Sequence, residues 1–185
     1  MVSDNLRQMY QEIILDLSEE NNARISPEEF SKKSQNSAYI ISKQFNPSCG
    51  DRISLAIKFQ NKAESQNKAE LQNKTKSQNK AELQNNFDNK NYFVEDFFWT
   101  GIGCNISMAS ANFIGDWIFE KNLIEIKKTY ELFLKLMNSR GQKLSLEEMD
   151  KLNDLSSFIG VAKFPARIKC ALLAWEAVRD IYSKI

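Results

Sequence analysis

Residues 46–59 read NPSCGDRISLAIKF and join a tight turn to a strand. Pro47 and Gly50 are turn-forming residues, and the apolar side chains that follow Asp51 nearly alternate, as in a half-buried strand. A second β-rich segment, AYIISKQF, precedes the turn at 38–45, and a third, YFVEDFFW, lies at 92–99. We therefore predict three strands, of which the second and third form an antiparallel hairpin.

Helical patterns lie on both sides of these strands. Residues 4–17 carry apolar side chains at the i, i+3, i+4 spacing of a helix that packs on a core. Four further helical patterns follow the third strand, at 105–119, 121–138, 146–157 and 166–182. Strands followed by helices predict an α+β domain with about five helices.

A hexapeptide repeat separates the second and third strands. From residue 60 the chain reads QNKAES, QNKAEL, QNKTKS and QNKAEL, and its large apolar residues are Leu71 and Leu83. Six residues advance a helix by roughly 240°, so the repeat forms no apolar stripe. We therefore expect residues 60–90 to be a flexible insert at the hairpin tip, where added length costs little. The prediction is a single domain, 1–185, that this insert interrupts.

Composition excludes several classes of function. The chain has 25 basic and 24 acidic residues, a balance that favours neither nucleic acid nor an anionic membrane as partner. It has no apolar run long enough to span a membrane and no signal-peptide pattern, so we expect a cytoplasmic protein. The absence of histidine removes Ser-His-Asp, Cys-His and histidine-based metal chemistry.

Three cysteines remain as the main carriers of chemistry. Cys49 lies in the predicted turn, Cys104 at the junction of the third strand and a helix, and Cys170 in the first turns of the last helix. An odd number in a reducing compartment argues against disulfides, and helix starts favour thiolates at Cys104 and Cys170. Three thiolates with Asp51 would supply the four ligands of a zinc site. Iron–sulfur ligation and simple buried thiols stay open as alternatives.

Three segments resemble the signature blocks of the NifU/IscU-like iron–sulfur cluster assembly family, and more closely its SufU branch. They are NPSCGDRISL (46–55), GIGCNISMASAN (101–112) and GVAKFPARIKCALLAWEA (160–177). Lys169 stands where the scaffold branch has a histidine, as in SufU-type proteins, and the long interval between Cys104 and Cys170 is also SufU-like. The segment 16–24 departs from the family pattern.

The resemblance implies a fold, a site and a function. The fold would be a three-stranded antiparallel sheet packed by helices, with Cys49, Asp51, Cys104 and Cys170 around one zinc ion. The protein would accept persulfide sulfur from a SufS-type cysteine desulfurase and pass it to downstream iron–sulfur assembly proteins. That role is sulfurtransferase-like and is not that of a stand-alone catalyst.

The resemblance also implies how sulfur moves. A desulfurase ligand would replace Cys49 on the zinc, and the freed thiolate would attack the partner's persulfide. Cys49 suits this role because it lies on a Pro/Gly loop, whereas Cys104 and Cys170 are anchored on helices. Arg167 either forms a salt bridge with the desulfurase or is a solvated charge.

Two other functions stay open. The same ligands would serve a scaffold on which an iron–sulfur cluster is assembled, or the zinc would be purely structural. The metal in the purified protein separates the sulfur acceptor from the scaffold, and stimulation of a desulfurase separates the sulfur acceptor from the purely structural zinc protein.

Overall fold

An antiparallel sheet of three strands in the order β1-β2-β3 forms the centre of the fold. A computed structural model describes residues 4–61 and 91–185. The strands are β1 (Ile40–Phe45), β2 (Arg52–Asn61) and β3 (Tyr92–Ile102). The three predicted strands and the antiparallel hairpin of β2 and β3 are confirmed.

Both hairpin strands are longer than their apolar patterns indicated. Asn61 pairs with Tyr92, so Gln60 and Asn61 belong to β2 although the repeat begins there. At the other end β3 continues through Gly101 to Ile102, which pairs with Arg52. Pairing with a neighbouring strand extends a segment beyond its apolar core, since backbone groups need partners whatever the side chain. The remaining residues of the predicted insert, 62–90, lie outside the described residues.

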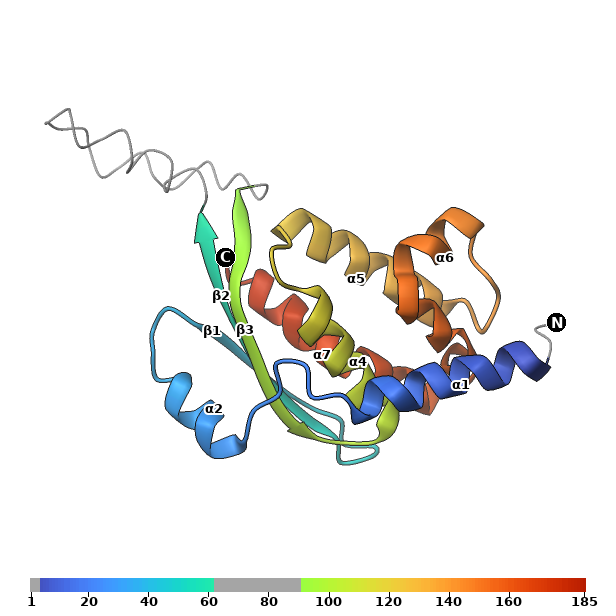
Figure 1. The fold of residues 1–185 in the computed structure, drawn as a ribbon, viewed down its shortest axis with the longest axis horizontal. Helices are drawn as coiled ribbons and strands as arrows, with labels where there is room; N and C mark the ends of the chain where they lie inside the picture. Colours follow the sequence, from blue (N-terminus) through green and yellow to red (C-terminus); the bar gives the residue numbers. More distant parts are fainter. Residues whose placement is uncertain (1–3, 62–90) are drawn as a thin grey trace, which may run out of the picture.

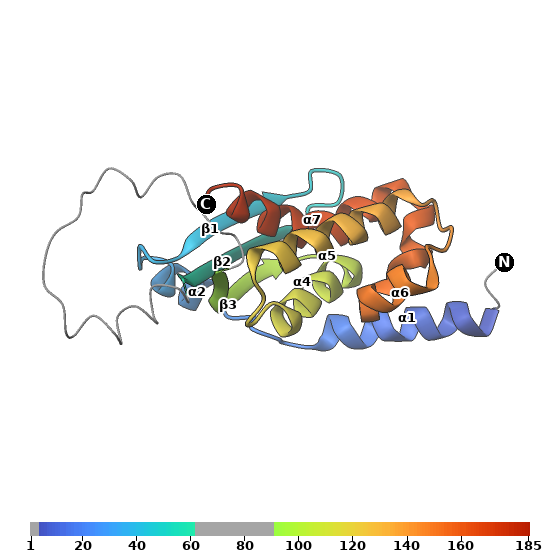
Figure 2. The ribbon, with the colours of Figure 1, turned by 90° about the horizontal axis from the view of Figure 1, so that it is seen from above.

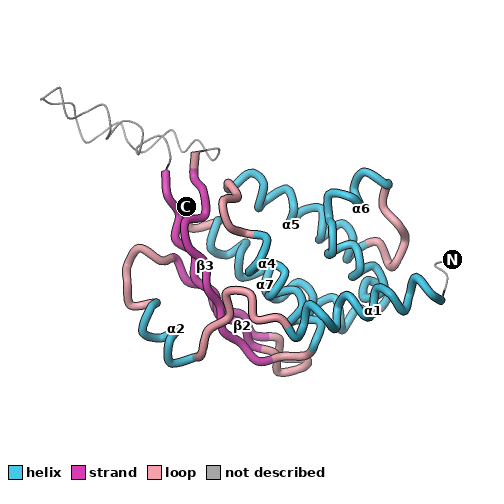
Figure 3. Tube along the Cα trace, in the orientation of Figure 1, coloured by secondary structure: helices cyan, strands magenta, loops and turns pink. Residues whose placement is uncertain are grey.

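Helices cover the two faces of the sheet unequally (Figures 1 and 3). The inner face of β2 carries the buried residues Ile53, Leu55 and Ile57. The larger helical layer packs on this side, and α7 contacts β1 and β2 while α4 contacts β3. The helices of this layer are α1 (Asp4–Glu19), α4 (Asn105–Trp117), α5 (Leu123–Asn138), α6 (Leu146–Leu152) and α7 (Pro165–Tyr182).

The predicted helix at 146–157 is wrong in its second half. The α-helical part ends at Leu152, and the 3₁₀ helix η2 follows over Asn153–Lys163. Asn153 has a φ of 49°, which breaks the α-helical hydrogen-bond ladder at that residue. Leu155, Phe158 and Ile159 of η2 still pack into the core, which explains why the apolar pattern continued.

A short helix on the other face of the sheet was not predicted. In α2 (Pro27–Lys33) the side chain of Ser26 caps the first turn by accepting a hydrogen bond from the Glu29 N–H. Phe30 packs on Phe98 with ring centroids 5.4 Å apart. Ser26, Pro27 and the two acids after them are a helix-start signal, but one buried side chain is too few to give a helical period.

The core lies between the sheet and the larger helical layer, whose helices Figure 2 shows from above. Trp99 of β3 and Trp175 of α7 are completely buried there. Helix α4 is buried from Ser107 to Gly115, so it runs through the middle of this layer. Among the described residues, no helix has both the length and the hydropathy that a membrane span requires.

Candidate metal centre

The candidate site lies at one end of the sheet, where three segments meet. The β1–β2 turn, the β3–α4 junction and the first turns of α7 come from distant parts of the sequence. Cross-strand pairing aligns the first two, because Phe45 and Ile102 both pair with Arg52. Helix α7 packs on β1 and β2 and brings the third segment to the same end.

Asn46 organises the turn that carries Cys49. Its side chain is 4% exposed, and its carbonyl oxygen accepts hydrogen bonds from Gly50 at 2.9 Å and from Cys49 at 3.4 Å. Its Oδ1 atom accepts a further bond from the Ser48 N–H at 3.1 Å. Gly50 has a φ of 82°, a conformation that favours glycine. The turn is therefore built by Asn46 and Gly50, while Cys49 remains exposed.

Cys49, Asp51 and Cys170 form one cluster of candidate metal ligands. One ligand atom from each lies within 4.8 Å of the others. The Cys49 and Cys170 Sγ atoms are 3.5 Å apart. The structure thus brings together three of the four residues that the sequence proposed.

Cys104 lies beside this cluster, outside the 4.8 Å group. It is the N-cap residue of α4, and its backbone N–H donates a hydrogen bond to Asp51 Oδ1 at 3.3 Å. Its thiol is exposed and lies 3.8 Å from the Ser107 hydroxyl. The fourth predicted ligand is therefore on the edge of the cluster, with its backbone tied to Asp51.

Asp51 is buried with one oxygen unused. Its Oδ2 atom has no hydrogen-bond partner among the described residues. Burial alone would raise the pKa of this carboxyl, but interactions with Ser107 and the three cysteines outweigh burial and lower it. A buried carboxylate with an unpaired oxygen is costly unless a cation compensates it.

Cys170 is the buried member of the cluster, with 5% of its surface exposed. Its sulfur accepts a hydrogen bond from Asn46 Nδ2 at 3.6 Å. Burial, followed by the neighbouring thiols and the Asp51 carboxylate, raises the pKa of the Cys170 thiol. Cys170 lies in the second turn of α7, whereas a helix dipole acts mainly in the first, so burial and the neighbouring groups dominate at this thiol.

Gly103 keeps space open beside the cluster. A Cβ atom at this position would collide with the Ser107 hydroxyl and would lie 3.0 Å from the Asp51 carboxyl carbon. Gly101 likewise has the Arg52 carbonyl where a side chain would begin, at 2.5 Å. Neither glycine has a positive φ, so the close approach of neighbouring atoms explains why glycine stands at both positions.

Arg167 does not contact the cluster. It is exposed, and its guanidinium lies over the Phe164 ring, 4.8 Å from the ring centre. Sequence reasoning missed Asn46 and Ser107, whose polar side chains are buried around the ligands. The Asn before Pro47 is a turn signal, but only the fold shows that its amide reaches Cys170.

The donor set suits a thiophilic cation. Thiolates and a carboxylate are zinc ligands, and sulfur also suits iron–sulfur clusters. The unpaired Asp51 oxygen and the raised pKa of Cys170 both describe a site that lacks positive charge. A bound cation would stabilise the thiolate and pair the carboxylate at once.

Known proteins resemble this chain in sequence. The chain is 30% identical over 145 residues to the zinc-dependent sulfurtransferase SufU of Bacillus subtilis, covering 78% of this chain and 76% of that protein. It is 30% identical over 135 residues to the iron–sulfur cluster assembly scaffold protein IscU of Streptococcus pyogenes, covering 73% and 64%. No protein-family model matches the chain.

A solved structure shows the same fold. The crystal structure of a putative iron–sulfur cluster assembly scaffold protein for the SUF system from Fervidobacterium islandicum superposes with a TM-score of 0.61. The match covers 95% of this chain and 97% of that one at 22% identity. The α+β architecture predicted from the sequence is confirmed.

Proposed function

This chain belongs to the SufU-type NifU/IscU-like iron–sulfur cluster assembly family, and we propose that it is a zinc-dependent sulfur acceptor. In this role Cys49, Asp51, Cys104 and Cys170 hold one zinc ion. The sulfur comes from a SufS-type cysteine desulfurase and goes on to iron–sulfur cluster assembly. The B. subtilis relative, named a zinc-dependent sulfurtransferase, supports the proposal.

One observation carries the proposal: the buried Asp51 oxygen without a partner lies in a cluster with two thiols. A purely structural carboxylate would have its oxygens satisfied, as nearly all buried polar atoms do. Bound zinc would supply positive charge that keeps the thiols ionised at neutral pH. The protein would supply the donors, with Asn46 and Ser107 placed around them.

Cys49 is the proposed acceptor of sulfur. Its thiolate attacks the terminal sulfur of the partner's persulfide, and a new S–S bond forms on Cys49. The old S–S bond breaks, and its electron pair leaves on the partner's cysteine as a thiolate, so no external oxidant is needed. Exposure and the short turn make Cys49 accessible, whereas Cys170 is buried and Cys104 caps a helix.

Arg167 is the proposed contact with the desulfurase. Stacking on Phe164 holds its guanidinium at the surface, three residues before Cys170. A carboxylate of the partner would meet it there. The alternative is that Arg167 is a solvated charge with no role in binding. Unchanged desulfurase stimulation by Arg167→Ala would establish that alternative.

A second candidate is assembly of an iron–sulfur cluster on the same residues. The S. pyogenes relative, named a scaffold, favours it. The purified protein would then be brown with iron and sulfide, whereas a zinc-bound acceptor is colourless.

Metal analysis and sulfur mapping test the proposal together. The wild type should contain one zinc, and incubation with a SufS-type desulfurase and cysteine should place a persulfide on the peptide with Cys49. Cys170→Ala should lose tight zinc binding, because its sulfur lies inside the cluster. Cys49→Ala should accept no sulfur.

The outcomes against the proposal are equally specific. A persulfide mainly on Cys104 or Cys170 would reassign the acceptor. Full zinc content in Cys170→Ala would remove that residue from the site. Wild type without zinc or sulfur acceptance would refute the function as a whole.

A further inference from the structure

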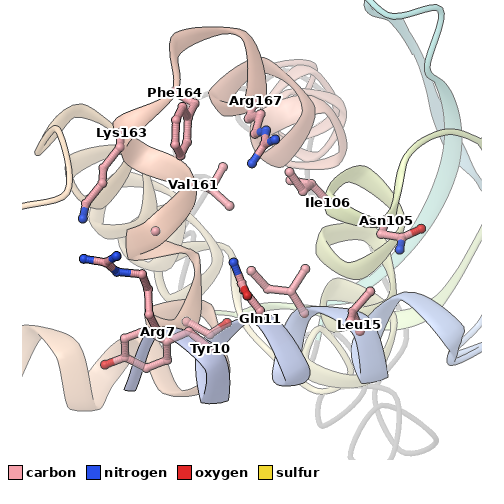
Figure 4. Close-up of a pocket in the computed structure, with 13 residues that line it drawn as sticks. Arg7, Tyr10, Gln11, Leu15, Asn105, Ile106, Val161, Lys163, Phe164 and Arg167 are labelled. Carbon is pink, nitrogen blue, oxygen red and sulfur yellow. The ribbon is translucent and has the colours of Figure 1, made fainter. Parts of the chain in front are cut away.

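A groove beyond the cysteine cluster runs between α1 and the η2–α7 junction. Its volume is about 520 Å³, a size that accommodates several side chains of a ligand. In Figure 4 the α1 residues Arg7, Gln11 and Leu15 face Lys163 and Arg167 across the opening.

The walls of this groove are apolar and open to solvent. Leu15 on α1 is 46% exposed and Phe164 at the start of α7 is 49% exposed. Ile106 and Val161 also line the groove. Exposed large apolar side chains that converge on one groove are typical of an interaction site.

The charges around the groove have one sign. Arg7, Lys163 and Arg167 line it, and no lining residue within 4–61 and 91–185 is acidic. Neither Lys163 nor Arg167 has an ion-pair partner among the described residues. The whole chain carries only +1, so this concentration of cations is local.

An unsatisfied hydroxyl lies in the same groove. Ser157 is 1% exposed and lines it, and its Oγ has no hydrogen-bond partner in the described part of the chain. Buried hydroxyls normally have a hydrogen-bond partner, and a bound group could supply the one that Ser157 lacks. It would donate to a carbonyl or carboxylate oxygen.

The groove adjoins the cysteine cluster through two segments. Asn105, on its rim, follows Cys104 directly, and Arg167 precedes Cys170 by three residues. A protein that reaches the cluster to transfer sulfur would therefore also lie near the groove.

We propose that this groove docks an acidic segment of the sulfur-donating partner, with a large apolar side chain flanked by carboxylates. The inference rests on the proposed function and adds a second contact surface to it. The apolar side chain packs among Leu15, Ile106 and Phe164, and the carboxylates pair with Lys163 and Arg167. Such charge complementarity mainly speeds association and orients the partner.

Lys163→Glu is the principal test, since Lys163 lies away from the proposed ligands. The aliphatic part of its side chain packs beside Gly141. Affinity of the zinc-loaded protein for a SufS-type desulfurase should fall about tenfold, as one reversed rim charge suggests. Lys163→Gln should fall less, and Leu15→Glu should resemble Lys163→Glu. Lys127→Glu, on the exposed surface of α5, is the matched control and should bind like wild type.

Two further measurements separate docking from sulfur acceptance and identify the segment that occupies the groove. Acceptance of sulfur from glutathione persulfide needs no docking and should be equal in Lys163→Glu and wild type. A photo-crosslinker in place of Leu15 should label an acidic segment of the desulfurase.

Each contrary result has its own meaning. Wild-type affinity in Lys163→Glu, or a crosslink to a segment without acids, overturns the groove and leaves the sulfur-acceptor function intact. A wild-type protein that takes sulfur from neither donor refutes the proposed function, and the groove falls with it.

Discussion

Asn46 connects two of the proposed ligands. Its side-chain oxygen holds the turn of Cys49, and its amide nitrogen contacts the sulfur of Cys170. Such outer contacts orient metal ligands and tune their charge. Asn46 thus helps to keep Cys170 fixed while Cys49 stays accessible.

Asn46→Asp should lower zinc affinity about tenfold, within the range typical of lost contacts around metal ligands. The carboxylate still accepts from Ser48 but cannot donate to Cys170, and we expect the loss of this contact to outweigh the attraction of the new negative charge for the cation. Competition with a chromophoric chelator measures the affinity.

Asn105→Asp is the matched control, because it adds the same charge beside Cys104 on an exposed residue. It leaves the Asn46–Cys170 contact intact. Zinc affinity that is equal in both variants would show that the Asn46–Cys170 contact contributes nothing.

At the scale of elements, β2 separates the insert from the candidate site. The strand has ten residues, which span roughly 30 Å. The cysteine turn precedes its first residue, and residues 62–90 follow its last. The two ends of the same strand therefore carry the two features.

Replacing residues 62–90 by Asn-Gly should leave zinc content and sulfur acceptance unchanged. Asn91 then completes a three-residue loop between paired strand ends. The free energy of unfolding should stay equal or rise by up to about 2 kcal/mol, since a loop that is about tenfold shorter costs less closure entropy.

Urea denaturation and zinc analysis check this outcome. Exchanging 62–90 for a Gly/Ser linker of equal length is the control for loop length alone. A loss of stability in both variants would show that the repeat itself contributes contacts.

At the scale of the whole molecule, tyrosine contacts hold distant elements together. Tyr39 donates to Asp96 across the sheet at 2.5 Å, and this bond together with burial raises its pKa to about 12. Burial between helices raises the pKa of Tyr182 to about 12 as well. Both phenols are therefore protonated in the folded protein at pH values where free tyrosine ionises.

The folded protein should lose stability between about pH 10 and 12. Below the unfolded pKa of about 10 the contribution of these phenols is complete. As pH rises towards their folded pKa of about 12, the unfolded state releases protons that the folded state retains, so the free energy of unfolding falls.

Tyrosinate absorbance follows this titration directly. Two of the five tyrosines should ionise only near pH 12 in the folded protein. Tyr39→Phe should remove one late-titrating group and flatten the decline in stability. A single transition of all tyrosines near pH 10 would contradict the prediction.

The sequence determined much of this protein by itself. Periodicity located the three strands and five of the helices, because each buries a regular set of apolar side chains. The cysteines and Asp51 stood out as candidate ligands because their chemistry is independent of the fold. Periodicity did not locate α2, whose position depends on one buried side chain. It also did not locate the change to 3₁₀ structure, which depends on the backbone conformation of Asn153.

Only the tertiary structure decided how the ligands relate to one another. Strand pairing and the docking of α7 place Cys49 and Cys170 3.5 Å apart, although 121 positions separate them. The fold also buries Asn46, Ser107 and Ser157, whose polar atoms gain meaning only from what surrounds them. Distances between residues that are far apart in the sequence depend on the packing of the whole core, and local sequence patterns do not determine that packing.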